Sequence, residues 1–107
     1  MAAEDTPFNR DAGIQRFEFT VELAWKCIQA FMKNQNIICR SPNECLKEAF
    51  QFGLMEDDSV WLEMMKDRNL TSHTYHEETA LIVLKKVPTY LKNLQELGSA
   101  IKKELKN

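Results

Sequence analysis

The chain has 107 residues, of which 44% are hydrophobic, and its formal charge at pH 7 is −2. This length predicts one domain with a modest core. The slightly acidic balance excludes a protein that binds nucleic acid through a generally basic surface. The chain lacks the run of about 18 or more apolar residues that a membrane-spanning helix requires.

Only three glycines and three prolines occur in the chain, and so few turn-forming residues predict long helices. Residues 1–8 are expected to be a disordered N-terminus, and their acidic start is not typical of a secretion signal. The three cysteines, Cys27, Cys39 and Cys45, show no CxxC spacing. We therefore expect free thiols, no metal site, no cofactor and a cytoplasmic protein.

The first helical pattern extends from about residue 9 to residue 34, with Asn9 as its candidate N-cap. One apolar stripe contains Ile14, Phe17, Val21, Ala24, Trp25, Ile28, Phe31 and Met32, and a second contains Phe19, Leu23, Cys27 and Ala30. A helix that is apolar on two sides is buried between partners. We therefore expect this helix at the centre of a bundle, with Trp25 and Cys27 in the core.

The clearest helix start in the chain is the stretch from Ser41 to Glu44. It places a serine N-cap before a first-turn proline and a capping-box glutamate. The short helix that follows is expected to bury Ala49 and Phe50 and to end at Gly53 in the left-handed conformation. The acidic residues Glu56, Asp57 and Asp58 then favour the positive end of the next helix, and a cation site there is the weaker alternative.

Two further helical patterns follow. Apolar residues of the first are Val60, Trp61, Met64, Met65 and Leu70, and those of the second are Leu81, Leu84, Val87, Leu91, Leu94, Leu97 and Ile101. The last helix is expected to kink at Pro88 and to carry Lys85 and Lys86 on a solvated face. Together these patterns predict an all-α, up-and-down antiparallel helical bundle that forms one domain over residues 1–107.

The chemically active side chains gather between Asp67 and Tyr75. Arg68 can hold a phosphate with a planar fork of donors, His73 can exchange a proton near neutral pH, and Tyr75 can accept a covalent group. On a straight helix Arg68 and Tyr75 share a face, whereas His73 points elsewhere. The three converge only if the helix ends or bends between them, or if a second subunit completes the site. Alternatively, they form a solvated helix end where Arg68 pairs with Asp67 or Glu63.

The pattern Arg68-x4-His73-x-Tyr75, with Asn69 directly after the arginine, resembles the signature of the HEPN (higher eukaryotes and prokaryotes nucleotide-binding) superfamily. Further stretches that resemble the prokaryotic nucleotidyltransferase substrate-binding protein family are Ile14–Thr20, Glu22–Lys26, Ser41-Pro42, Glu48–Phe50, Gly53-Leu54 and Trp61–Met65. Members of that family usually begin with a further long helix, which this sequence is expected to lack. The second stripe of the first helix would then have no cover, which predicts a homodimer.

The resemblance implies a metal-independent endoribonuclease of the toxin type. His73 would act as general base or general acid at the ribose 2′-hydroxyl and the leaving oxygen, and Arg68 would stabilise the charge on the phosphate. Asp67, Asn69 and Ser72 would support them. One imidazole does not readily serve as both acid and base, so we expect two sites to face each other across the homodimer. His76 is the less favoured proton carrier.

The implied partner is a separately encoded minimal nucleotidyltransferase, because this chain has no Gly-Ser followed by Asp-x-Asp to hold magnesium. The partner would neutralise the ribonuclease by adenylylating Tyr75. The alternative function is a non-catalytic subunit that binds RNA, a nucleotide or another substrate at the Arg68/His73 site. A third hypothesis is a helical interaction module with a degenerate site.

Overall fold

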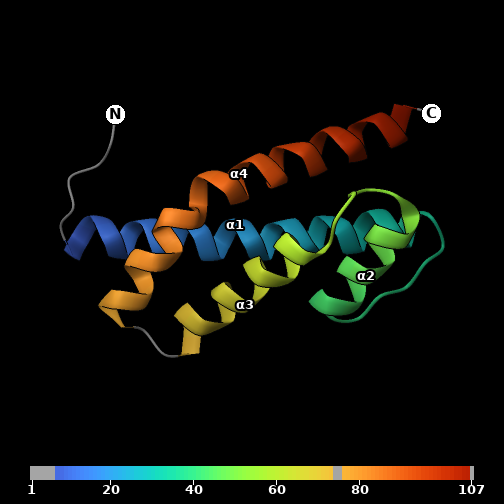
Figure 1. The fold of residues 1–107 in the computed structure, drawn as a ribbon. Helices are drawn as coiled ribbons and strands as arrows, with labels where there is room; N and C mark the ends of the chain where they lie inside the picture. Colours follow the sequence, from blue (N-terminus) through green and yellow to red (C-terminus); the bar gives the residue numbers. More distant parts are fainter. Residues whose placement is uncertain (1–6, 74–75, 107) are drawn as a thin grey trace.

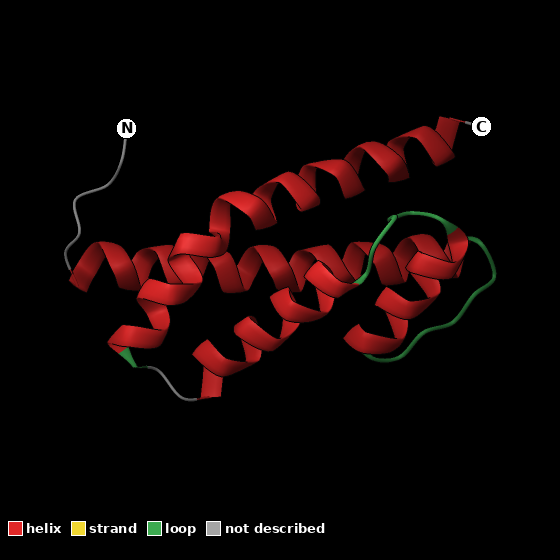
Figure 2. Ribbon diagram, viewed as in Figure 1, coloured by secondary structure: helices red, strands yellow, loops and turns green. Residues whose placement is uncertain are grey.

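The computed structural model describes residues 7–73 and 76–106, without the side chains of Pro7, Phe8 and His73. Within these ranges the chain forms four α-helices and no strand, so the predicted all-α fold is confirmed (Figure 2). The helices are α1 (Pro7–Asn34), α2 (Pro42–Phe52), α3 (Ser59–His73) and α4 (Glu77–Lys106).

Helix α1 lies at the centre of the molecule and packs against each of the other three helices. Figure 1 shows α3 running antiparallel to α1, α4 running antiparallel to α3, and α2 beside the C-terminal end of α1. The 28 residues of α1 span roughly 42 Å at the helical rise, which accounts for the longest dimension of the molecule, 45 Å. Because α3 is antiparallel to α1 and α4 is antiparallel to α3, the predicted up-and-down arrangement is confirmed.

The predicted helix ends are mostly confirmed. The Ser41 hydroxyl accepts the Glu44 N–H at 3.2 Å, and Gly53 ends α2 with φ of 100°. Asp57 accepts both the N–H and the hydroxyl of Ser59 at 2.9 Å, which caps α3. Helix α1 begins at Pro7 rather than at residue 9, because a proline fits the first turn of a helix. Residues 7 and 8 are therefore helical, and residues 1–6 lie outside the described part of the chain.

The core consists of apolar side chains from all four helices. Its members include Ile14, Phe17, Val21, Ile28 and Met32 of α1, Leu46 and Ala49 of α2, Trp61 and Met64 of α3, and Ala80, Val83, Tyr90 and Leu97 of α4. Trp25 is partly buried and packs against this core, whereas Phe50, Leu70 and Leu91 are exposed, so the burial predicted for these three leucine and phenylalanine residues is wrong. Each lies at the edge of an apolar stripe, where the crossing angles of the helices decide which side is covered.

The second apolar stripe of α1 is exposed in the monomer. Phe19 and Leu23 are 74% and 64% exposed, and Cys27 lies on the surface rather than in the core. Within the described residues, no other helix covers this side of α1. The homodimer that would cover it stays a prediction.

The cysteine prediction is wrong, because Cys39 and Cys45 form a disulfide. Both residues are buried, and the bond joins the loop after α1 to the first turns of α2. Their proximity depends on how the loop folds back on α1, where the Gln29 amide donates to the Cys39 carbonyl at 2.9 Å; a spacing of six residues does not indicate it. A cytoplasmic location therefore loses the support of free thiols and stays a prediction.

Helix α4 contains Pro88 in its interior, and Figure 1 shows α4 changing direction part-way along its length. Proline removes one helical hydrogen bond at this point, as predicted. In the described part of the chain, no helix is long and apolar enough to cross a membrane.

Candidate functional site

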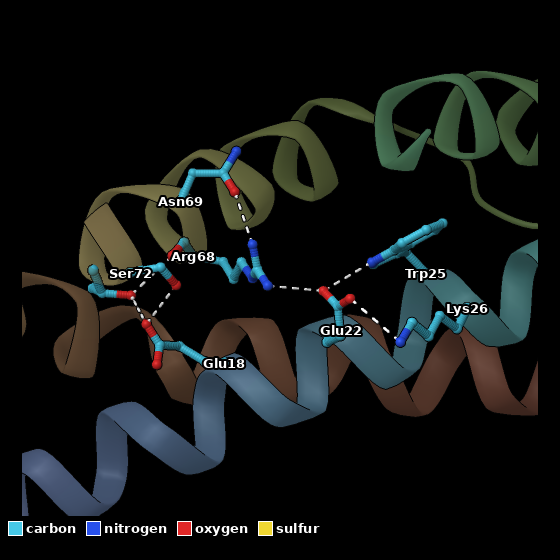
Figure 3. Close-up of polar contacts among 8 residues, drawn as sticks. Glu18, Glu22, Trp25, Lys26, Arg68, Asn69 and Ser72 are labelled. Atoms are coloured by element: carbon cyan, nitrogen blue, oxygen red, sulfur yellow. Dashed lines mark hydrogen bonds and ion pairs between the residues drawn. The ribbon is translucent and has the colours of Figure 1, made fainter. Parts of the chain in front are cut away.

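The polar segment identified in the sequence lies on the last turns of α3. Helix α3 is unbroken from Ser59 to His73 and ends directly after the histidine, which is where the sequence predicts an end or irregularity of the helix. Figure 3 shows Arg68, Asn69 and Ser72 beside the charged face of α1. Tyr75 and the side chain of His73 lie outside the described residues.

The Arg68 guanidinium is held by residues of two helices. Its Nη2 atom lies 3.0 Å from Glu22 Oε2 of α1, and the two side chains are 28% and 31% exposed. Its Nη1 atom donates to Asn69 Oδ1 at 3.2 Å. The alternative in which Arg68 pairs with Asp67 or Glu63 is wrong, because both of those carboxylates face α4. Arg68 therefore forms a cross-helix site on the α1–α3 surface.

Glu22 is the centre of this charge network (Figure 3). Its Oε2 atom also accepts the Trp25 indole N–H at 3.0 Å, and its Oε1 atom lies 3.5 Å from Lys26 Nζ. The Trp25 hydrogen bond, followed by the charges of Arg68 and Lys26, lowers the pKa of Glu22 despite partial desolvation. The carboxylate is therefore ionised at neutral pH and holds the guanidinium in place.

One donor of Arg68 has no partner among the described residues. Its Nε atom is buried and makes no hydrogen bond to the described residues. A buried unsatisfied donor costs about 1–3 kcal/mol, and such groups in folded proteins are uncommon enough to require an explanation. The guanidinium thus keeps hydrogen-bonding capacity that none of the described residues uses.

A second carboxylate, Glu18, fixes the C-terminal turn of α3 to α1. The hydroxyls of Thr71 and Ser72 both donate to Glu18 Oε2 at 2.8 Å. Glu18 and Glu22 are four residues apart and therefore lie on the same face of α1. These two contacts set the orientation of the turn that carries Arg68.

Asp67 faces the opposite side of α3, toward α4. It is buried, and its Oδ2 atom accepts the Tyr90 hydroxyl at 2.5 Å and the Lys86 ammonium at 3.3 Å. Lys86 also binds Glu63 at 2.8 Å, so its prediction as part of a solvated face is wrong. Burial, followed by the Asp67 hydrogen bond, raises the pKa of the Tyr90 phenol above its ordinary value. Asp67 thus joins α3 to α4 on the side away from Arg68, and a supporting role in the site stays a prediction.

Sequence reasoning missed the residues on the other helices that hold the site. Glu18, Glu22 and Lys26 recur every four residues on α1, between its two apolar stripes. This polar row is the signal from which a charged partner of Arg68 on α1 could have been predicted. Nothing comparable marks Tyr90, because a tyrosine in an apolar stripe is indistinguishable from an ordinary core residue. No group of three or more candidate metal ligands occurs among the described residues.

The fold and this arginine-centred surface define an all-α bundle with a charged site between its first and third helices. The family model described as "Nucleotidyltransferase substrate binding protein like" matches residues 2–103. The chain belongs to this family, which confirms the resemblance seen in the sequence.

Two similar proteins extend the comparison. The chain is 36% identical over 83 residues to the probable ribonuclease HepT of Haemophilus influenzae (strain ATCC 51907 / DSM 11121 / KW20 / Rd); the match covers 73% of this chain and 57% of that protein. The chain thus spans little more than half the length of this relative. A crystal structure of a protein from Thermus thermophilus superposes with a TM-score of 0.84 at 35% identity, over 92% of this chain and 87% of that one.

Proposed function

We propose that the protein is the HEPN-type subunit of a two-component minimal nucleotidyltransferase system and acts as a metal-independent endoribonuclease toxin. The observation that carries the proposal is Arg68. It is held by Glu22 and Asn69, has an Nε donor that no described residue accepts, and stands five residues before His73 on one continuous helix. The similarity to a probable ribonuclease supports the same chemistry.

The chemistry needs a proton carrier and a charge stabiliser. His73 removes the proton from a ribose 2′-hydroxyl, whose oxygen attacks the adjacent phosphorus and displaces the 5′-oxygen of the next nucleotide. Arg68 pairs with the negative charge that builds up on the phosphate oxygens. General acid–base help of this kind contributes about 10²–10⁴-fold. In a homodimer the partner's copy of this histidine protonates the leaving oxygen.

The proposed partner is a separately encoded minimal nucleotidyltransferase, and the family name supports this association. The partner adenylylates Tyr75, which stands two residues after His73. One adenylyl group adds about one negative charge and a bulky base, which then compete with RNA for Arg68. In this scheme modification neutralises the toxin without unfolding the bundle.

One observation favours a second candidate function, a non-catalytic subunit that binds a nucleotide or other substrate. The ion pair with Glu22 neutralises much of the Arg68 charge before any ligand arrives. A site that exchanges one anion for another suits reversible binding as well as catalysis. This candidate keeps the nucleotidyltransferase as partner and assigns Arg68 to ligand recognition alone.

Cleavage of RNA by pure protein in EDTA distinguishes the two functions. The ribonuclease predicts cleavage that Arg68→Ala and His73→Ala both abolish, with unchanged helical content by circular dichroism. Arg16→Ala, a change at an exposed arginine of α1, and His76→Ala are the matched controls and leave cleavage intact. Cleavage that survives His73→Ala would contradict this mechanism. Nucleotide binding without any cleavage would favour the second candidate.

A further inference from the structure

A second cationic feature lies on α1, beyond the site just described. A hollow of about 510 Å³ opens where the C-terminal half of α1 meets the loop that follows it. Its lining includes Lys26, Gln29 and Lys33 of the helix and Ile37, Ile38 and Arg40 of the loop. Three of these side chains are cations and no lining residue is acidic, although the whole chain has a net charge of −2. The hollow is therefore a local concentration of positive charge.

The loop that forms one wall of the hollow is fixed in place. The Gln29 amide donates to the Cys39 carbonyl at 2.9 Å, the Ile37 N–H donates to the Met32 carbonyl at 2.8 Å, and the disulfide of Cys39 ties the loop to α2. These bonds leave Ile38 70% exposed beside the cations. The hollow thus combines a rigid apolar surface with positive charges.

The helix dipole explains only one of these charges. Lys33 lies in the last turn of α1, where a cation is favourable. Lys26 lies about two turns earlier, and Arg40 lies outside the helix. No ion pair engages Lys33 or Arg40 within the described ranges. The exposed cations therefore remain available to an anion from outside the chain.

Lys26 joins this hollow to the Arg68 site. It binds Glu22 Oε1 while Arg68 binds Oε2 of the same carboxylate, and Figure 3 shows Lys26 on the far side of Glu22 from Arg68. Lys33 follows Lys26 by seven residues, so it lies on the same face about 10 Å further along the helix axis. Arg68, Lys26 and Lys33 thus lie in one row along the molecule, with the Glu22 carboxylate between the first two.

We propose that the hollow binds the single-stranded RNA whose reacting phosphate lies at Arg68, with backbone phosphates on Lys33 and Arg40 and a base against Ile38. The inference rests on the proposed function and names where the rest of the substrate binds. Single strands combine a charged backbone with exposed base faces, and proteins that bind them pair a cationic groove with apolar surface. A duplex would require a more extensive basic surface than this chain offers.

The test is the salt dependence of RNA affinity. The probe is a fluorescein-labelled single strand of about ten nucleotides, a length within the usual range for one single-strand site, and a His73→Ala background prevents its cleavage. Anisotropy titrations over several salt concentrations compare Lys33→Gln/Arg40→Gln with the matched control Lys85→Gln/Lys92→Gln, which removes two exposed charges from α4. Loss of two phosphate contacts reduces the slope of log K against log[salt] by about 1.4. The control keeps the parent slope.

A measurement without mutation gives a second test. Bound RNA should protect Lys33 from acetylation in the otherwise unaltered His73→Ala protein, read by peptide mass spectrometry, while Lys85 and Lys92 stay reactive. An unchanged slope in Lys33→Gln/Arg40→Gln together with unprotected Lys33 would overturn the inference, and the proposed function would stand if Arg68→Ala still abolished cleavage. If Lys33→Gln/Arg40→Gln kept its RNA affinity but no longer bound the transferase, the inference would be overturned and the hollow would be a protein-docking face instead. Absence of any RNA binding by the parent would remove both proposals.

Discussion

Tyr90→Phe removes a single hydroxyl from beneath the site and tests how Asp67 is used. In the folded protein that hydroxyl donates to Asp67 Oδ2 at 2.5 Å, and the Tyr90 ring stacks on Phe17 with a centroid distance of 5.8 Å. Phenylalanine keeps the ring and its packing. The change therefore deletes only the hydrogen bond, and Asp67 retains Lys86 at 3.3 Å as its remaining partner.

The expected loss follows from the partner's charge and burial. A hydrogen bond to a charged group contributes about 1.5–3 kcal/mol, more than a neutral one. Asp67 is only 7% exposed, so water does not readily replace the lost donor. A chain of this size loses roughly 4 °C of Tm per kcal/mol, so Tyr90→Phe should lower Tm by roughly 6–12 °C.

Urea unfolding and thermal melts measure how much the Tyr90–Asp67 hydrogen bond contributes to stability. The variants compared are Tyr90→Phe, Asp67→Asn and the double variant. We expect the two changes to be coupled by about 1 kcal/mol or more, because residues in contact are not additive. RNA cleavage measured well below the melting temperature should survive Tyr90→Phe, since Asp67 acts on the site through packing. A Tyr90→Phe Tm within one or two degrees of the parent would refute the assignment of Asp67 to the α3–α4 contact. Additive losses of stability in the double variant would refute it as well.

Four further predictions concern the core, the Arg68 site and the proposed partners. Trp61→Ala should cost about 3–5 kcal/mol, because Trp61 is fully in the core. Trp25→Ala should cost less, because Trp25 is only partly buried; equal melting temperatures of the two variants would contradict this order. The lowered pKa of Glu22 means that its contribution to stability is present above the ordinary value of 4.5 and is lost as the pH falls through the folded value. Glu22→Gln should therefore lose less stability on acidification than the parent, as judged by urea midpoints. Intact-mass measurement after incubation with the transferase, ATP and magnesium should show an added adenylyl group that Tyr75→Phe prevents. Sedimentation over a range of concentrations should show a dimer, and a stable monomer at micromolar concentration would remove the composite site.

The helices and their ends were predictable because local chemistry determines them. The stretch from Ser41 to Glu44 and the glycine at position 53 specify a start and a stop through their own side chains and backbone, whatever they pack against. The apolar stripe of α1 likewise identified most of its buried face. In contrast, Phe50, Leu70 and Leu91 are exposed, because burial at the edge of a stripe depends on helix crossing angles that no local pattern encodes.

The site was only partly predictable for a related reason. Arg68 and Asn69 were identified from a local motif, and the structure shows them in contact with each other. The partner of Arg68 is Glu22, which lies on another helix, and a sequence offers many carboxylates that could fill that role. The disulfide between Cys39 and Cys45 was missed for the same reason, because the fold of the loop brings the two thiols together. Contacts between elements are decided by packing, which the spacing of residues does not reveal.

In the proposed function, binding of a phosphate at Arg68 would be an exchange of anions. Glu22 occupies Nη2, Asn69 occupies Nη1, and Nε has no partner in the described chain. A phosphate that displaces the carboxylate can use Nε and Nη2 together, since these two atoms form one edge of the guanidinium fork and bind oxyanions in pairs. The exchange would give Arg68 Nε a hydrogen-bond acceptor, and Asn69 would still orient the plane of the guanidinium. Lys26 would still hold the displaced Glu22, so the incoming phosphate need not leave a carboxylate without a counter-charge.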